Sequence, residues 1–272
     1  MELYKYSGAG NDFIVLDGRT EDVSEYRQSD RICSLCSRRN GYRAADGRVG
    51  ADGLMILSPS DICDFRMEFF NPDGSSGMMC GNGGRCIVAF ADHLGIRPGS
   101  GIDAFVFEAA DGMHSAEILS REGTLSTVRL RMIDVTEYHR ELEGWFVDTG
   151  TRHLVLFVPD VDDVDMETAG REYRWNPIFA PDGVNVNFVS RSDGNRAIRV
   201  RTFEKGVEAE TLACGTGVTA SAVASYLESG RNACDPVRYE VQARRDRLSV
   251  EFVPGGDRFQ DVFLTGPALR VA

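Results

Sequence analysis

Two cysteines of this sequence have neighbours that suit acid–base chemistry. One begins the stretch Cys80-Gly81-Asn82-Gly83, ahead of a helix predicted over 84–94, and the other begins Cys214-Gly215-Thr216-Gly217, ahead of a helix predicted over 218–229. The first turn of a helix has backbone N–H groups without an intrahelical partner, and glycines let a ligand approach them. Each stretch predicts a cradle for a carboxylate or phosphate beside a thiol of lowered pKa. One such stretch alone would equally suit a structural cysteine in a glycine turn.

The surroundings of the two cysteines repeat as well. The second stretch follows the first at an offset of 214 − 80 = 134 residues. Phe69-Phe70-Asn71 precedes the first cysteine as Thr202-Phe203-Glu204 precedes the second, and an Asp-Gly pair lies upstream of each. Two matching settings half a chain apart indicate two copies of one unit, each with a thiol at the start of a helix.

Composition limits the classes of protein to consider. The chain has 272 residues, which suits two domains of ordinary size. Its formal net charge of −12 makes nucleic acid and anionic membrane poor partners. Met1-Glu2 is followed by no basic and apolar leader, and no apolar run approaches roughly 18 residues, so neither export nor membrane insertion is expected. Seven cysteines, an odd count, favour a reducing cytoplasm over a secreted disulfide framework.

Strands and helices alternate along the chain. A third helix is expected over 29–39 and an acidic surface segment over 160–167. Strands are expected within 3–17, 47–57, 65–70, 101–112, 114–118, 128–135, 144–148, 154–158, 183–188, 197–203, 238–253 and 262–271. The boundary between the halves is expected near Leu119. This gives domains of 1–118 and 119–262, with a last strand, about 263–272, completing the first domain.

Three other motifs have both a chemical and a structural interpretation. The loop Gly8-Ala9-Gly10-Asn11-Asp12 lacks the third glycine of a nucleotide-binding loop, so its polar residues either line a site or form an Asx turn. Cys33-x-x-Cys36 would need a second pair, from Cys63 or Cys86, to bind zinc or act in redox chemistry; at helical spacing such cysteines are more typical of a core. His153 either serves a site or packs in a hydrogen-bonded position.

Taken together, four groups of residues resemble diaminopimelate epimerase. They are Gly8-Ala9-Gly10-Asn11-Asp12-Phe13, Cys80-Gly81-Asn82-Gly83-x-Arg85-Cys86, Asn185-x-Asn187-Phe188, and Arg201-Thr202-Phe203-Glu204-Lys205-Gly206 through Cys214-Gly215-Thr216-Gly217. The similarity runs from residue 8 to 217, with the motifs in the family's order. It implies a PLP-independent reaction without cofactor or metal: the interconversion of LL- and meso-2,6-diaminopimelate, in lysine and peptidoglycan synthesis.

The resemblance also implies a fold. It is an α/β (α+β) chain of two pseudo-symmetric domains, each a mostly antiparallel strand barrel around a central helix, with the site in the cleft between them. The expected partner is a small-molecule amino acid, with no nucleic acid and no membrane, and the expected location is cytoplasmic. The sequence leaves open whether the protein forms a homodimer.

Inverting an α-carbon without a cofactor needs a base on one face of the carbon and an acid on the other. Cys80 and Cys214 are the expected pair, one as thiolate and one as thiol. The N–H groups at Gly81, Asn82, Gly215 and Thr216 are expected to hold the α-carboxylate. The other expected substrate contacts are Asn11, Asn71, Asn185, Glu204 and Lys205, with Thr151 and His153 as further candidates.

The distal binding end departs from the family's pattern. Lys205 stands where the family usually has arginine, so a bidentate contact to a carboxylate is lost while the charge stays. Thr151-Arg152-His153 replaces the usual Asn-Pro-His, and Gly53 stands where some members have glutamine. The first two departures lie at the distal binding end and not at the cysteines, so they bear on the identity of the substrate rather than on the racemase chemistry. The change at Gly53 is milder, because other members have glycine there.

Three rival interpretations use the same residues. A racemase of the same fold acting on another amino acid would be recognised with a panel of substrates. A two-cysteine thiol redox protein would turn over peroxide or disulfide without exchanging an α-proton. A non-catalytic amino-acid-binding protein would keep its ligand affinity when either thiol is removed.

Overall fold

The computed structural model describes residues 1–77, 79–99, 103–192, 196–230 and 235–271. The chain divides into unit 1, Met1–Leu130 with Gly266–Ala272, and unit 2, Arg131–Thr265. The domain boundary expected near Leu119 falls inside strand β6 (Gly112–Glu122), which forms a hairpin with the next strand. Hairpin partners share one hydrogen-bonded ladder, and the division of the chain accordingly comes later, at the end of the hairpin, after Leu130.

Unit 1 contains a closed sheet. Its strands are β1 (Tyr4–Gly8), β2 (Asn11–Asp17), β3 (Gly53–Ser58), β4 (Phe65–Phe70), β5 (Phe105–Ala109), β6 and β7 (Leu125–Arg131). Its helices are α1 (Ser29–Cys36) and α2 (Gly81–His93), with a short 3-10 turn η1 (Ser24–Arg27). Neighbouring strands pair in chain order, and the second half of β16 (Phe259–Arg270) pairs with both β7 and β1. The last strand therefore closes the sheet into a barrel, which removes its free edges.

Unit 2 is built from the remaining strands. They are β8 (Tyr138–Glu141), β9 (Gly144–Asp148), β10 (Arg152–Phe157), β11 (Asn185–Arg191), β12 (Ala197–Glu204), β13 (Ala209–Thr211), β14 (Val237–Gln242), β15 (Arg247–Pro254) and the first half of β16. Its helices are α3 (Met166–Arg174) and α4 (Gly215–Glu228), with 3-10 turns η2 (Val161–Asp163) and η3 (Pro177–Phe179). The main strands pair in the order β8-β9-β10-β11-β12-β14-β15-β16. A bridge between Val135 and Phe259 links the two ends of this series.

The two units repeat one pattern of strand directions. In unit 1, β2 runs parallel to β3, β3 antiparallel to β4, and β4 parallel to β5. In unit 2, β10 runs parallel to β11, β11 antiparallel to β12, and β12 parallel to β14. In each series a long helix follows the third strand. The expectation of two similar α/β units rich in antiparallel strands is confirmed.

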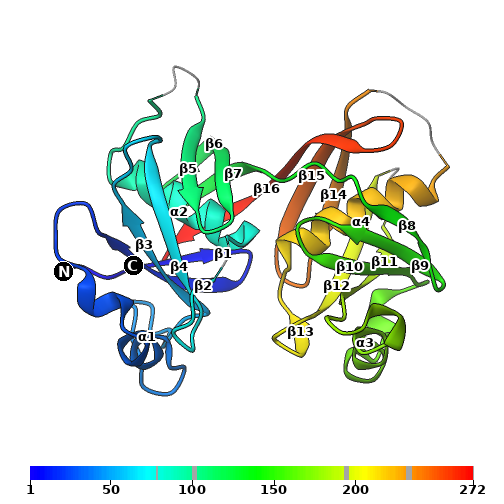
Figure 1. Ribbon diagram of the computed structural model, residues 1–272, viewed down its shortest axis with the longest axis horizontal. Coiled ribbons are helices and arrows are strands. Elements are labelled where there is room, and N and C mark those ends of the chain that lie inside the picture. Colours follow the sequence, from blue (N-terminus) through cyan, green and yellow to red (C-terminus); the bar gives the residue numbers. More distant parts are fainter. Residues whose placement is uncertain (78, 100–102, 193–195, 231–234, 272) are drawn as a thin grey trace. The chain divides into compact units, whose positions relative to one another are not determined.

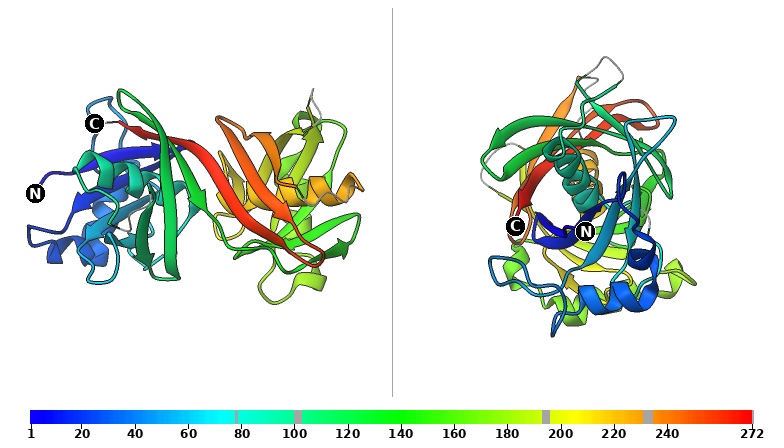
Figure 2. Two further views of the ribbon diagram at one scale, coloured as in Figure 1. Left: turned by 90° about the horizontal axis from the view of Figure 1, so that it is seen from above. Right: turned by 90° about the vertical axis from the view of Figure 1, so that its left-hand side faces the viewer.

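Each unit holds its long helix among its strands (Figures 1 and 2). The residues from Gly81 to Ala91 of α2 are all buried, and so are those from Gly217 to Tyr226 of α4. A helix covered on every side consists mainly of apolar or small residues, and α4 uses Ala, Ser, Thr and Gly for this. The strand β1 approaches α2 closely, since a Cβ at Gly8 would lie 2.7 Å from the Asn82 carbonyl oxygen.

Both long helices begin about one turn earlier than the sequence predicts. The glycines and polar residues after each cysteine were expected to lie ahead of the helix, because glycine weakens a helix interior. In the structure they form its first turn, with Cys80 and Cys214 as the N-cap residues. The strand expected over 101–112 begins at Phe105 in the described part of the chain, and residues 101–102 lie outside that part.

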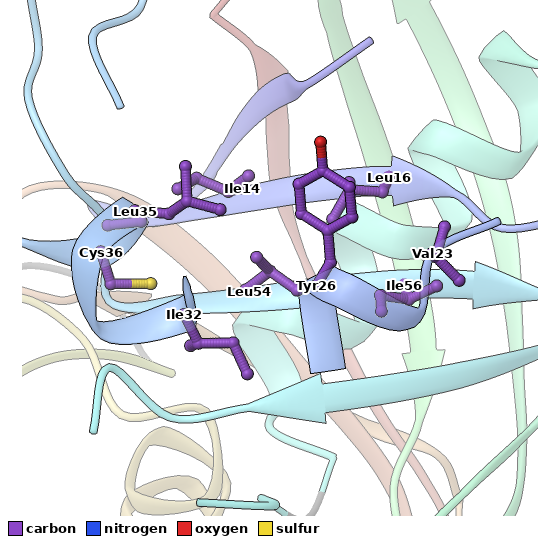
Figure 3. Packing of buried hydrophobic residues seen from close by; sticks show 10 residues of the cluster. Ile14, Leu16, Val23, Tyr26, Ile32, Leu35, Cys36, Leu54 and Ile56 are labelled. Carbon is purple, nitrogen blue, oxygen red and sulfur yellow. The ribbon is translucent and has the colours of Figure 1, made fainter. Parts of the chain in front are cut away.

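The side of the sheet away from α2 is covered by α1 and η1. Ile32, Leu35 and Cys36 of α1 pack with Ile14 and Ile56 of the strands in one buried cluster (Figure 3). Cys36 is therefore a core residue, and burial raises the pKa of its thiol to about 12. Cys33 lies on the exposed side of the same helix.

The segment expected to be an acidic surface stretch, 160–167, contains more structure than predicted. It forms η2 and the first turn of α3, where the Asp165 side chain accepts a hydrogen bond from the Thr168 N–H. Its acidic residues cap these turns, which hydrophobic periodicity alone does not reveal. Among the described residues, no helix has the length and apolarity needed to cross a bilayer.

Candidate functional site

Cys80 caps helix α2 of unit 1 with its own sulfur. The Gly83 N–H donates to Cys80 Sγ at 3.2 Å, and the Gly84 N–H donates to the Cys80 carbonyl at 2.8 Å. The N–H groups of Gly81 and Asn82 belong to the first turn, ahead of these bonds. Cys80 is half-buried. Its sulfur thus lies at the positive end of the helix dipole, which favours a negative charge there.

Cys214 occupies the equivalent position at the start of α4 in unit 2. The Gly217 N–H donates to Cys214 Sγ at 3.4 Å, and the Val218 N–H donates to the Cys214 carbonyl at 2.8 Å. The first-turn N–H groups here are those of Gly215 and Thr216. The Thr216 hydroxyl lies 3.3 Å from Cys214 Sγ. The two cysteines predicted to act as a pair therefore have matching local geometry.

Two asparagines beside Cys80 are held by a chain of hydrogen bonds. Arg85 Nη2 donates to Asn82 Oδ1 at 2.8 Å, and Asn82 Nδ2 donates to Asn11 Oδ1 at 2.8 Å. Asn11 Nδ2 then donates to Asp52 Oδ2 at 3.3 Å. Since guanidinium only donates and carboxylate only accepts, the ends of the chain fix the orientation of both amides. The predicted site residues Asn11 and Asn82 thus belong to one network.

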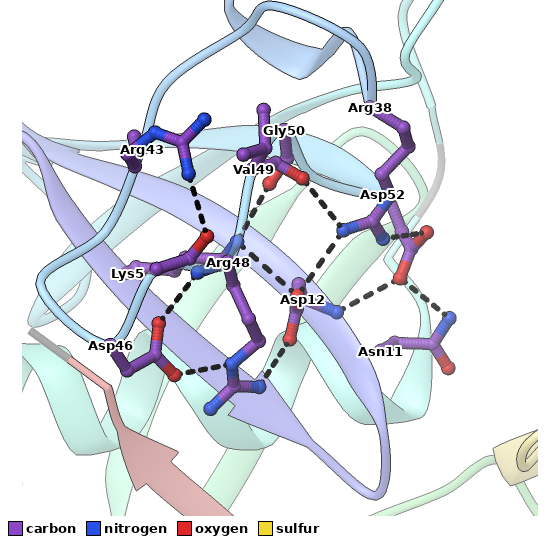
Figure 4. A network of polar contacts seen from close by, with 11 residues as sticks. Lys5, Asn11, Asp12, Arg38, Arg43, Asp46, Arg48, Val49, Gly50 and Asp52 are labelled. Carbon is purple, nitrogen blue, oxygen red and sulfur yellow. Dashed lines mark hydrogen bonds and ion pairs between the residues drawn. The ribbon is translucent and has the colours of Figure 1, made fainter.

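Behind this chain lies a compact group of charges around Asp12 (Figure 4). Lys5, which is fully buried, places its ammonium 3.2 Å from Asp12 Oδ2. Arg48 donates to Asp12 Oδ1 at 2.9 Å, and Arg38 donates to both Asp12 and Asp52. These contacts connect the loop before β3 to the start of β2. They thereby hold Asp52, which accepts the hydrogen bond from Asn11, in place.

In unit 2 the polar chain runs from Asn187 to Cys214. Asn187 Nδ2 lies 3.0 Å from His153 Nδ1, and His153 Nε2 lies 2.9 Å from Thr151 Oγ1. Thr151 Oγ1 donates to Thr216 Oγ1 at 3.3 Å. Three predicted site residues (Thr151, His153 and Thr216) thus belong to one series of contacts that ends at the Cys214 sulfur. Gly217 makes room for them, because a Cβ there would lie 2.4 Å from Asn187 Oδ1.

His153 is completely buried on strand β10. Burial lowers the pKa of its imidazole to about 3, and the positive charge of Lys205 acts in the same direction. The ring is therefore neutral at neutral pH. Both interpretations of His153 are compatible with this position, since it packs with satisfied ring nitrogens and also belongs to the chain that reaches Cys214.

Asn185 holds the turn that follows strand β12. Its Oδ1 accepts the Lys205 N–H at 2.9 Å, and its Nδ2 donates to the Arg152 carbonyl at 3.1 Å. The same turn is fixed from the other side by Arg174, which pairs with Glu208 at 3.0 Å. Asn185 therefore places Lys205 from within unit 2. Its direct contact with a substrate stays a prediction.

Two predicted site residues stand at strand ends. Asn71 follows β4 and Glu204 ends β12, so they occupy matching places in the two units. Asn71 Nδ2 donates to Ser75 Oγ at 3.0 Å within the predicted turn. Both are half-buried, and their contact with a substrate stays a prediction.

Asn187 and Asp52 belong to these half-sites but are not among the site residues predicted from the sequence. Asn187 had a usable signal, because it alternates with Asn185 in a stretch whose other residues are Val184, Val186 and Phe188. A fully buried amide in such a strand must find partners within the fold. Asp52 was noted only as half of a repeated Asp-Gly pair.

None of the described cysteines is joined to another described cysteine by a disulfide. These cysteines are Cys33, Cys36, Cys63, Cys80, Cys86 and Cys214. Burial raises the pKa of the Cys86 thiol well above its ordinary range, as expected of a core cysteine. In the part of the chain that the structure describes, no group of three or more His, Cys, Asp or Glu residues could hold a metal ion. Cys234 lies outside the described residues.

The fold class is a repeated α/β unit in which a cysteine caps the buried helix of each copy. Solved structures share this two-unit fold. A phenazine biosynthesis protein of the PhzF family from Bacillus anthracis has a TM-score of 0.73 at 14% identity, over 100% of this chain and 98% of its own. A hydroxyproline epimerase from Agrobacterium vitis has a TM-score of 0.68 at 15% identity, over 98% of this chain and 88% of its own.

Sequence comparison is more specific than the fold. The family model described as diaminopimelate epimerase matches residues 3–127 and 145–270. Diaminopimelate epimerase of Chlorobaculum tepidum is 40% identical over 270 residues, covering 97% of each chain. That of Aquifex aeolicus is 38% identical over 285 residues, covering 100% of this chain and 96% of its own. The chain therefore belongs to the diaminopimelate epimerase family, and it is an isomerase.

Proposed function

We propose that this protein interconverts LL- and meso-2,6-diaminopimelate by proton transfer between two cysteines and the substrate's α-carbon. The observation that carries the proposal is the pair of cysteines at equivalent N-caps of a repeated unit. Membership of the family supports the substrate, because the relatives compared above are named for it. The reaction would supply an intermediate of lysine and peptidoglycan synthesis.

In this mechanism one cysteine takes the α-proton and the other returns a proton to the opposite face. The N–H groups of Gly81, Asn82, Gly215 and Thr216 hold the α-carboxylate and stabilise the charge that develops as the proton leaves. Which thiol acts as the base depends on the isomer bound. The chain's own thiols and N–H groups supply every step, so no PLP or other cofactor is needed.

The central test removes each thiol in turn. Cys80→Ala and Cys214→Ala are each expected to lower epimerisation by about a hundred- to ten-thousandfold, the usual contribution of one general acid or base. Cys33→Ala is the matched control, since Cys33 is an exposed cysteine on α1. The assay is proton NMR in deuterium oxide, which follows α-proton exchange in the two diaminopimelate isomers. Turnover close to wild type in either single variant would refute the two-base mechanism.

A racemase acting on another amino acid is the second candidate. One observation favours it: Thr151, which stands where the family usually has asparagine, has its hydroxyl engaged with His153 and Thr216. A panel of amino acids in the same NMR assay separates the two candidates. Faster exchange with any other amino acid than with diaminopimelate would replace the proposed substrate.

Lys205 offers a test of the distal binding end. The chain has only two lysines, and the other one, Lys5, is fully buried. If Lys205 binds the distal carboxylate, Lys205→Ala is expected to raise KM for diaminopimelate about ten- to a hundredfold, whereas Lys205→Arg should hold or improve it. Substrate is also expected to protect Lys205 from an amine-reactive reagent. Two variants with wild-type KM and an unprotected Lys205 would remove it from the substrate site.

The cellular location and the oligomeric state of the enzyme also need to be established. We propose that it works in the cytoplasm, on the basis of its odd number of cysteines and the reaction assigned to it. A homodimer is left to measurement of the molar mass in solution.

A further inference from the structure

The hydrogen-bond chain that ends at Cys214 has a defined direction. It starts at Asn187, whose side chain is fully buried. Asn187 Nδ2 donates to the Leu154 carbonyl at 3.3 Å, and Asn187 Oδ1 accepts from the Thr202 hydroxyl at 2.9 Å. A carbonyl only accepts, so the NH₂ group of Asn187 must be the side that faces Leu154. The same NH₂ group therefore donates to His153 Nδ1.

This contact decides the tautomer of His153. Nδ1 accepts a hydrogen bond, and a neutral imidazole carries one hydrogen, so that hydrogen is on Nε2. His153 Nε2 then donates to Thr151 Oγ1 at 2.9 Å. In this arrangement His153 is a fixed hydrogen-bond donor rather than a group that takes up and releases a proton.

The two threonine hydroxyls continue the same direction. Thr151 Oγ1 accepts from His153, and its own hydrogen goes to Thr216 Oγ1 at 3.3 Å. Thr216 Oγ1 has then accepted a hydrogen bond and lies 3.3 Å from Cys214 Sγ. The hydrogen of the Thr216 hydroxyl is then available to the Cys214 sulfur, which already accepts the Gly217 N–H.

We propose that Thr151 is a positioning residue for Cys214: through Thr216 it directs a hydroxyl hydrogen at the cysteine sulfur and favours its thiolate form. The proposal deepens the proposed function, on which it rests for its catalytic meaning. It also changes the role expected of Thr151, from a contact of the substrate to a support for the second cysteine.

Two charged residues close to this series of hydrogen bonds, Lys205 and Glu204, must be kept constant in a test. Lys205, on the turn after β12, acts electrostatically on His153. Glu204 is its neighbour at the end of that strand. Substitutions confined to Thr151 leave both charges, and the first turn of α4, unchanged.

The test compares Thr151→Val with Thr151→Ser. Valine keeps the shape of threonine and removes the hydroxyl, whereas serine keeps the hydroxyl. The rate of modification of Cys214 by methyl methanethiosulfonate, a small thiolate-selective reagent, is measured against pH by peptide mass spectrometry. In Thr151→Val the Cys214 profile is expected to move to higher pH, with a rate at neutral pH about three- to tenfold lower, as for the loss of one hydrogen bond. Thr151→Ser is expected to keep the wild-type profile.

Cys80 in unit 1 is the internal control, and its profile is expected to be the same in all three proteins. The proposal is overturned if Thr151→Val has the wild-type Cys214 profile, if Thr151→Ser shifts it as much as valine does, or if Cys80 shifts together with Cys214. Tryptophan fluorescence establishes that each variant is folded. The readout does not use turnover, so an absence of epimerase activity on every substrate would refute the proposed function and leave this result standing.

Discussion

Replacement of His153 by glutamine is expected to change how stability depends on pH. His153 is fully buried, and its pKa falls from 6.5 in the unfolded chain to about 3 in the folded one. Between these values the unfolded chain binds a proton that the folded protein does not. Stability is therefore complete above pH 6.5, falls as the pH is lowered through this window, and stops falling below about pH 3.

The size of the effect follows from the two pKa values. One pKa unit corresponds to about 1.4 kcal/mol, and pH 5 lies about 1.5 units below the pKa of a histidine in the unfolded chain. Wild type should thus lose about 2 kcal/mol of unfolding free energy between pH 8 and pH 5 through this residue. His153→Gln should be less stable than wild type at pH 8, because its polar partners are disturbed, yet lack this part of the pH dependence.

Urea unfolding at pH 8, 6.5 and 5 measures the difference. Both tryptophans, Trp145 and Trp175, lie in unit 2 together with His153, so their fluorescence reports unfolding of the right unit. His139→Gln, at an exposed position on β8 of the same unit, controls for the loss of a histidine as such. Equal pH slopes for wild type and His153→Gln would refute the assignment of a neutral, buried imidazole.

Three further predictions test the supports of the two half-sites. Gly217→Ala should destabilise unit 2 by about 1–3 kcal/mol in the same urea assay, because its Cβ would overlap a buried amide oxygen. Lys5→Met should cost about 1.5–3 kcal/mol in thermal or urea unfolding, since it removes the buried partner of Asp12 and the donor to the Gly50 carbonyl while Arg38 and Arg48 still pair with Asp12, and a loss below about 1 kcal/mol would contradict this. If Cys80 and Cys214 reach one α-carbon, mild peroxide should join them in a disulfide that dithiothreitol reverses and substrate prevents; peptide mapping that finds Cys33 joined to Cys36 instead would favour the redox interpretation.

The sequence by itself identified the two cysteines that precede helices and the repeat that contains them. Cys80 and Cys214 stand out because glycines follow each one and a helix begins there, and all of this is local information. Most strands were also predictable, because an alternating or apolar pattern is a property of consecutive residues. The strands β4 and β9, for example, have the predicted bounds. The family, too, follows from motifs whose order along the chain needs no structure.

Only the tertiary structure decided which polar side chains meet. His153 contacts Asn187 across 34 positions, and Thr151 contacts Thr216 across 65. Such contacts depend on the register of β10 against β11 and on the placement of α4, neither of which is a property of a local pattern. The sequence shows that Asn185, Asn187 and His153 are polar residues in apolar strands. Each of them needs a hydrogen-bond partner once it is buried, because a buried amide or imidazole without one destabilises the folded protein. Which partner it finds is determined by the fold.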